Sequence, residues 1–321
     1  MFLAAWFLAA LAIILAWPAP ILLARCTWPT RDPFAALVLW QAIGLAGGLS
    51  MIGAMLCYGL SPLGDNLVSG LHGLLLIMIG TAPAGKDALG FWNVVGLTTA
   101  GALTLHLLFT LLLSYLRIST GRRRHRDLLA ILSEPHDDPG TVVISHAAPV
   151  AYCLPGGARS VTVLSDSLMA ALDERELTAV LAHESSHLTQ RHHLLLWAFA
   201  AWRAALPWLP TTRVAQRAVN ELIEMLADDA ALKVSDRGTL IRAVAVVADG
   251  QQPGQYVPDV SEPLEVNDDA GASATTVARV KRLLSAAPAL PPAQRLAVLA
   301  SAVLLLLVPT ALLIVPGVVH V

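Results

Sequence analysis

Four long apolar runs constrain the fold of this chain more than any other feature of its sequence. They cover Phe2 to Leu23, about Phe34 to Leu60, about Phe91 to Leu116, and Leu296 to Val315. Each is long enough to cross the hydrocarbon core of a bilayer, which needs about 20 apolar residues. Hydrophobic residues make up 56% of the 321 residues and charged residues 14%, a composition far from that of a soluble protein. The sequence therefore predicts a mainly α polytopic membrane protein with about four transmembrane helices.

Three further apolar features need an interpretation. The first run has no basic n-region, so we interpret it as a retained helix and not as a cleavable signal peptide. The stretch Leu67 to Gly80 is shorter and contains glycine, which favours an interfacial or re-entrant helix over a fifth span. Arg203 and Pro207 interrupt Leu194 to Pro210, so we expect a helix on the membrane or packed under the functional site, with a full span as the alternative.

The arginines predict the orientation in the membrane. Arg25 and Arg31 lie between the first two runs, and five arginines follow the third: Arg117, Arg122, Arg123, Arg124 and Arg126. Short loops rich in Lys and Arg stay in the cytoplasm, so both groups are expected there, and the connection Ser61 to Gly90 is expected outside. This divides the cell-membrane protein into a membrane domain with three helices (1–121), a cytoplasmic domain (122–290) and a C-terminal transmembrane helix (291–321).

Charge and cysteine content exclude other classes. The formal net charge of −2 gives no basic surface for nucleic acid, so we expect no direct nucleic-acid partner. Cys26, Cys57 and Cys153 are scattered without CxxC spacing, so neither a disulfide framework nor a cysteine zinc site is expected.

The cytoplasmic domain is predicted to be α+β with a small sheet. Strands are expected at Thr141 to Ser145, Ala151 to Leu154 and Ser160 to Leu164, the last two joined by a turn at Pro155-Gly156-Gly157. A loop is expected from Gly250 to Thr276, which is rich in Gly, Pro, Asp and Ser.

A helix predicted from Glu174 to about His193 contains the main chemical motif. Asp173 and Glu176 have the spacing of a capping box at its start. Within it, His183-Glu184-Ser185-Ser186-His187 has the form HExxH. Residues four apart share one face of a helix, so both imidazoles can reach one cation, with Glu184 beside it as general base. Zn²⁺ held by neutral imidazoles and a carboxylate, with one position left for water, supports hydrolysis.

The third protein ligand is expected on a later helix near Asn220 to Leu232. Glu224 is our choice, with Asp228 four residues on to accept a hydrogen bond from a ligand histidine and orient it. Glu221 is the reserve ligand. His193 has the spacing of an HExxHxxGxxH site, but Gln190 replaces the glycine that turns the chain back, so His193 is expected to point away from the metal.

Two assignments stay open at this stage. The pair His192-His193 is interpreted as a polar edge at the membrane face. The donor that stabilises an oxyanion is not identified, and four side chains are candidates: His192, His193, Arg237 and Arg242.

Four segments together resemble one family closely. They are Ala151-Tyr-Cys-Leu-Pro-Gly-Gly, Ser160-Val-Thr-Val-Leu, Leu172 to Glu184, and Glu224-Met-Leu-Ala-Asp-Asp. This pattern resembles the membrane metallopeptidases of the BlaR/MecR antirepressor type, which are related to the HtpX and CAAX-prenyl protease group of gluzincins. The resemblance implies zinc ligands at His183, His187 and Glu224, a catalytic glutamate at Glu184, and the aspartate of ExxAD at Asp228.

The resemblance also implies a biological role. Such proteins transmit an envelope signal by cleaving themselves or a cytoplasmic transcriptional repressor, in antibiotic-stress regulation. The chain stops at Val321 without an extracellular penicillin-binding domain, so direct β-lactam sensing is not expected. Two alternatives are an HtpX-like protease of membrane-protein quality control and a catalytically silent membrane receptor or scaffold.

Overall fold

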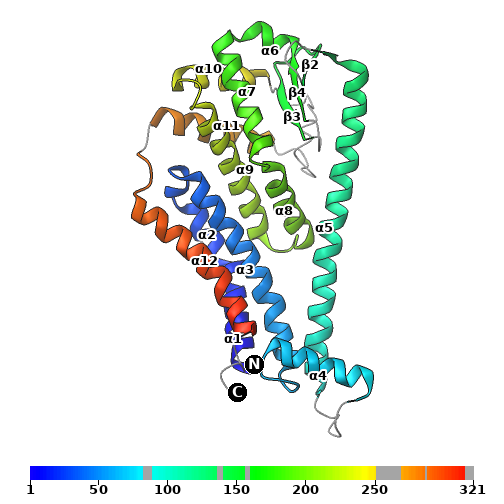
Figure 1. Cartoon of the computed structure of the whole chain (residues 1–321). Helices are drawn as coiled ribbons and strands as arrows, with labels where there is room; N and C mark the ends of the chain where they lie inside the picture. Colours follow the sequence, from blue (N-terminus) through cyan, green and yellow to red (C-terminus); the bar gives the residue numbers. More distant parts are fainter. Residues whose placement is uncertain (82–88, 136–139, 156–159, 251–268, 286–287, 315–321) are drawn as a thin grey trace.

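The computed structural model describes residues 1–81, 89–135, 140–155, 160–250, 269–285 and 288–314. Within these residues, four helical segments are long and apolar enough to cross a membrane: Phe2–Arg25, Pro33–Leu60, Phe91–Leu132 and Pro292–Ile314. They gather toward one end of the molecule, and the sheet lies at the other (Figure 1). The predicted number of spans is confirmed.

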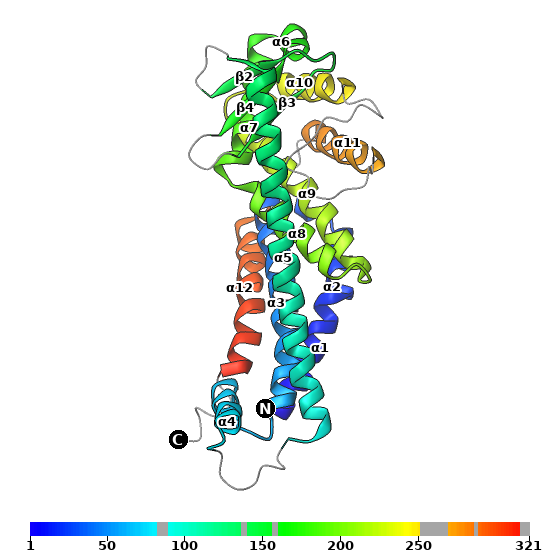
Figure 2. The same ribbon diagram turned by 90° about the vertical axis from the view of Figure 1, so that its right-hand side faces the viewer.

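The first and third spans differ in detail from the prediction. The first consists of two helices, α1 (Phe2–Ala16) and α2 (Pro18–Arg25), because Pro18 has no N–H to continue α1. The third, α5 (Phe91–Leu132), is one helix of 42 residues, about 60 Å long at 1.5 Å per residue. Its last turns therefore carry the arginine cluster beyond the apolar part and reach the sheet (Figure 2).

Two other membrane-end helices follow the sequence closely. The second span is α3 (Pro33–Leu60), where Asp32 accepts a hydrogen bond from the backbone N–H of Ala35. Helix α4 (Leu67–Ile79) has 13 residues, fewer than the roughly 20 that a span requires, and begins with a capping box of Asn66 and Ser69. The fourth span is α12 (Pro292–Ile314).

The sheet has four strands in the order β1-β2-β4-β3. Strands β2 (Thr141–Ile144), β3 (Ala151–Leu154) and β4 (Val161–Ser165) were predicted to within one residue, whereas the two-residue β1 (Glu134–Pro135) was not predicted. Strand β4 pairs parallel with β2 and antiparallel with β3, which makes β3 an edge strand. Gly156 and Gly157 of the predicted turn lie outside the described residues.

Helix α7 (Glu174–Thr189) follows the sheet after the short α6 (Asp166–Ala171). Asp173 and Glu176 form the expected capping box. The predicted continuation of this helix to His193 is wrong. The chain leaves the helix at Gln190 and Arg191, where Arg191 has a left-handed backbone with φ of 52°, and then starts a new helix, α8 (His192–Ala205).

Helices α8 and α9 (Pro210–Ala231) form a hairpin that packs against the membrane helices. Phe199 of α8 and Val219 of α9 share an apolar core with Trp40 of α3. His106 of α5 lies with its Nε2 atom 2.9 Å from the carbonyl oxygen of Ala205, at the end of α8. Because α8 has only 14 residues and is buried against these neighbours, the segment 194–210 is packed under the candidate site and is not among the four candidate spans.

The chain then forms α10 (Arg237–Gly250) and α11 (Asp269–Ser285). The predicted loop Gly250 to Thr276 is wrong for residues 269–276, which are helical, and residues 251–268 lie outside the described residues. The start of α11 contains an aspartate followed by several alanines, which favours a helix. The preceding residues have the composition of a loop, and the prediction extended that loop too far. Helix α11 packs against α9 and α10.

Candidate metal centre

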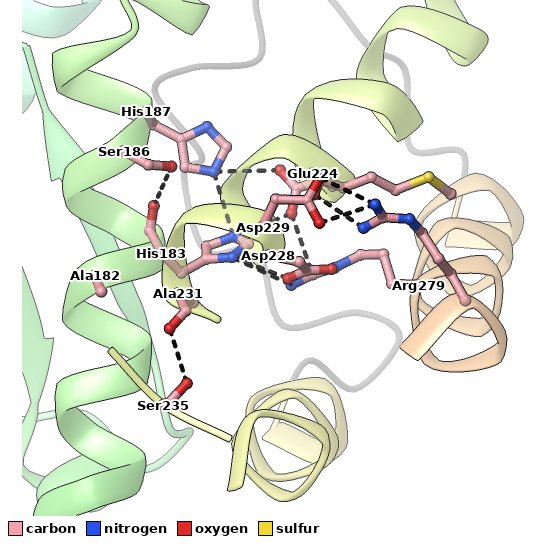
Figure 3. A network of polar contacts seen from close by, with 12 residues as sticks. Ala182, His183, Ser186, His187, Glu224, Asp228, Asp229, Ala231, Ser235 and Arg279 are labelled. Atoms are coloured by element: carbon pink, nitrogen blue, oxygen red, sulfur yellow. Dashed lines mark hydrogen bonds and ion pairs between the residues drawn. The ribbon is translucent and has the colours of Figure 1, made fainter. Parts of the chain in front are cut away.

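The site is built where α7 and α9 pack side by side. His183 lies on the buried face of α7, together with Ala179, Val180 and Ser186, and His187 follows one turn later. Glu224 is on α9, a helix with an apolar stripe that includes Leu222, Ile223 and Met225. Burial of these two faces against each other brings the three polar side chains together (Figure 3).

The three side chains have the geometry of a metal site. The Nε2 atoms of His183 and His187 are 3.3 Å apart. The carboxylate oxygens of Glu224 lie 3.3 Å from the Nε2 atom of His183 and 3.6 Å from that of His187. Two nitrogen ligands about 2.0–2.1 Å from a zinc ion at a tetrahedral angle are about 3.4 Å apart, so the observed spacing fits one such ion. Among the described residues, these three are the only such group that could hold a metal.

Asp228 supports His183 from the side opposite the cluster. Its Oδ1 atom lies 3.1 Å from the Nδ1 atom of His183, and its side chain is fully buried. Burial opposes its charge, but hydrogen bonds with His183 and Arg279 hold the pKa of Asp228 below its usual range. An ionised carboxylate there makes Nδ1 the protonated nitrogen of His183 and leaves Nε2 free to bind a cation.

Arg279 of α11 is a part of the site that the sequence did not reveal. Its guanidinium lies 2.9 Å from Oε2 of Glu224 and contacts both carboxylate oxygens of Asp228. Although burial opposes ionisation of Glu224, Arg279 and His183 together lower its pKa. Glu224 is therefore a carboxylate, the form that a metal requires. The predicted loop ended just before Arg279, so no motif pointed to it.

The position of His192 also differs from what the sequence predicted. It is buried, with its Nδ1 atom 3.1 Å from the Nδ1 atom of His187, and is therefore not a polar edge at the membrane face. The turn at Gln190 and Arg191 brings it back beside the motif. Burial is the main cause that lowers the pKa of His192 to about 4, so that its ring is neutral at pH 7.

The remaining candidates lie elsewhere. Glu221 and His193 are not members of the metal-ligand group among the described residues. Arg237 donates to the carbonyl oxygen of Leu283, and Arg242 pairs with Glu176 at the start of α7. Both arginines therefore make these contacts with residues other than the three candidate ligands.

Glu184 interacts electrostatically with Cys153 on the edge strand β3. Burial raises the pKa of Cys153 on β3 to about 12, and the negative charge of Glu184 raises it further against a hydrogen bond with Thr162. Glu184 is half-buried. The side chain of Glu184 is therefore within electrostatic reach of the edge strand β3, which packs against α7.

Residues 122–248 match the model of peptidase family M48. The match supports an M48 metallopeptidase, and it covers the end of α5, the sheet, helices α6 to α9 and most of α10. The match is to family M48 and not to the BlaR/MecR antirepressor type. Comparisons with curated proteins and with solved structures gave no match.

The M48 match contains all three members of the metal-ligand group, as well as Glu184 and Asp228. It ends before α11, so Arg279 lies outside it. An M48 peptidase acts on protein or peptide substrates and depends on a metal. Four helices of the described residues are long and apolar enough to cross a membrane, which indicates a multi-pass membrane protein.

Proposed function

We propose that this protein is a membrane-embedded zinc endopeptidase with His183, His187 and Glu224 as metal ligands. The single observation that carries the proposal is the mutual spacing of the ligand atoms, 3.3 Å between the two Nε2 atoms and 3.3 and 3.6 Å from them to the carboxylate of Glu224. Zinc suits this set because two imidazoles and one carboxylate leave a fourth tetrahedral position open.

The residues around the ligands have separate chemical roles. A zinc ion bound here would supply a Lewis acid and lower the pKa of a water molecule. Glu184, next to His183 on α7, would take a proton from that water and pass it to the leaving amine. Asp228 holds His183 in one tautomer through the 3.1 Å contact at Nδ1, and His192 does the same for His187.

The proposed biological role is regulatory proteolysis. We propose that the peptidase domain faces the cytoplasm and cleaves a transcriptional repressor or the protein itself in envelope or antibiotic-stress signalling. The support is the distribution of arginines between the spans and the resemblance of four sequence segments to BlaR/MecR-type antirepressor peptidases. The match to peptidase family M48 is compatible with this role and equally with quality control of membrane proteins.

Metal analysis of the purified full chain, combined with a proteome comparison, tests the proposal. The wild type should contain about one zinc ion per chain, and Glu184→Ala should retain zinc but lose cleavage. Cells with the wild type should contain cleavage products that cells with Glu184→Ala lack, and these products would name the substrate. A wild type that contains zinc but produces no such products would favour a silent receptor or scaffold.

A further inference from the structure

Arg279 lies on α11, outside the M48 match, yet it contacts three residues of the proposed zinc site, Glu224, Asp228 and His183. Its Nη1 atom is 2.9 Å from Oε2 of Glu224. Its Nε atom is 2.9 Å from Oδ2 of Asp228, and its Nη2 atom is 2.6 Å from Oδ1 of the same carboxylate. One planar guanidinium therefore binds Asp228 through two parallel contacts and Glu224 through a third (Figure 3).

The geometry restricts the carboxylate of Glu224. Its Oε2 atom is shared by Arg279 and His183, and its Oε1 atom is the one nearest to His187. Both carboxylates lie on the same face of α9, four residues apart, where their like charges repel. A rigid fork with five donors can satisfy both at once, whereas the ammonium group of a lysine is a single point charge.

Contacts of Arg282, one turn after Arg279, fix the position of α11 along α9. Arg282 donates to the carbonyl oxygens of Met225 and Thr30 and pairs with Asp229. Met225 and Asp229 each follow a residue that Arg279 contacts, so both arginines bind the same stretch of α9. Thr30 belongs to the short helix η1 (Trp28–Thr30), which connects the first two spans. The helix that carries Arg279 is thus fixed to the metal-site helix and to the membrane domain together.

We propose that Arg279 is a positioning residue of the zinc centre, which fixes the carboxylates of Glu224 and Asp228 in the orientation that the metal and His183 require. This inference rests on the proposed zinc site. Arg279 acts through Glu224 and through His183, which it reaches by way of Asp228 and by the 3.5 Å contact between its Nη2 atom and Nδ1 of His183. Partners in such positions are typically worth 10–100-fold in metal affinity or activity.

A purely structural ion pair would behave differently. Loss of a buried pair that only holds α11 to α9 would destabilise the protein to the same extent with and without metal. Loss of a positioning residue would change the affinity for zinc and the environment of the bound ion. The two roles therefore separate in measurements on the metal itself.

The test uses the full chain in detergent, with Arg279→Met, Arg279→Lys and the control Lys281→Met. Lys281 is exposed on the same helix, so its substitution removes a positive charge without touching the site. Zinc affinity is measured by competition with a chromophoric chelator, and the cobalt-substituted proteins are compared by visible absorption. We expect Arg279→Met to bind zinc about 10–100-fold more weakly and to shift the cobalt bands, and Arg279→Lys to recover only part of both.

The outcomes separate this inference from the proposed function. If the wild type itself binds no zinc, the proposed function fails. If the wild type binds zinc and cleaves, but both Arg279 variants match Lys281→Met in zinc affinity and cobalt spectrum, Arg279 is not a positioning residue. Equal losses of thermal stability with and without metal, at unchanged zinc affinity, would likewise overturn the inference in favour of a structural ion pair.

Discussion

The Nδ1 atom of His192 lies 3.1 Å from the Nδ1 atom of His187, and the Nε2 atom of the same ring lies 3.2 Å from Oε1 of Gln190. One arrangement of protons satisfies both contacts with neutral rings. His187 donates from Nδ1 to His192, and His192 donates from Nε2 to the side-chain oxygen of Gln190. The Nε2 atom of His187 then carries the lone pair of the ring, and it lies 3.3 Å from Nε2 of His183 and 3.6 Å from Oε1 of Glu224.

This relationship predicts that His192→Phe, which removes the acceptor and keeps a ring of similar size, weakens zinc binding about tenfold. His193→Phe is the matched control, because its ring is the next residue on α8 but is not in the metal-ligand group among the described residues. The zinc affinities of the two variants are measured by competition with a chelator. Equal affinities in both variants would show that His192 does not orient His187.

The choice of third ligand predicts a clear difference in metal content. Glu224→Ala should lose stoichiometric zinc, because two imidazoles alone hold the ion weakly, whereas Glu221→Ala should retain it. Metal analysis after gel filtration measures both. Retention of zinc by Glu224→Ala together with its loss from His193→Ala would show that the ligand assignment is wrong.

Zinc binding should depend on pH in a predictable direction. In the metal-free protein, burial and the charge of Arg279 oppose protonation of His183, but Asp228 and Glu224 outweigh them and raise its pKa to about 9. A metal must displace that proton, so apparent affinity should rise about tenfold per pH unit toward pH 9 and then level off. Calorimetry at pH 7.5 in buffers of different ionisation enthalpy should find about one proton released per zinc ion. Release of no proton would contradict a charged His183 in the metal-free site.

The edge strand β3 should bind substrate by strand addition. Val150 accepts a backbone hydrogen bond from Ser165, so pairing alternates along β3 and the N–H of Cys153 points away from β4. Cys153→Pro removes that donor, whereas Cys153→Ala removes only the thiol. We expect Cys153→Pro to lower kcat/KM about fivefold or more at unchanged zinc content and thermal stability, as the loss of one hydrogen bond would. A folded, zinc-loaded Cys153→Pro that cleaves like Cys153→Ala would rule out strand addition at this edge.

The proposed topology predicts the compartments of two fusion reporters. A reporter inserted after Arg126 should behave as cytoplasmic, and one inserted near Lys86 as external, because short loops rich in arginine remain inside. Paired reporters, one active only in the cytoplasm and one only outside, measure both positions. The reverse pattern would show that α4 crosses the membrane or that the first span is removed.

The amino-acid sequence alone determined the features that depend on local patterns. Length and apolarity identified the four candidate spans, and short runs of strand-favouring residues beside a turn sequence identified β2, β3 and β4 to within one residue. The HExxH spacing put His183 and His187 on one helical face, and the spacing of Glu224 and Asp228 suggested their shared face on α9. In each case the property follows from a single helix or strand, so no knowledge of distant contacts was needed.

Only the tertiary structure decided which distant side chains complete the centre. Arg279 reaches Glu224 because α11 packs against α9. The residues that precede Arg279 are rich in Gly, Pro, Asp and Ser, so their composition predicted a loop and gave no local sign of that packing. His192 reaches His187 because the chain leaves α7 at Arg191, which has a left-handed backbone conformation. Residues other than glycine rarely adopt this conformation, so it could not be predicted from an arginine in the sequence. Both contacts arise from how separate helices are packed, and packing depends on all the elements at once.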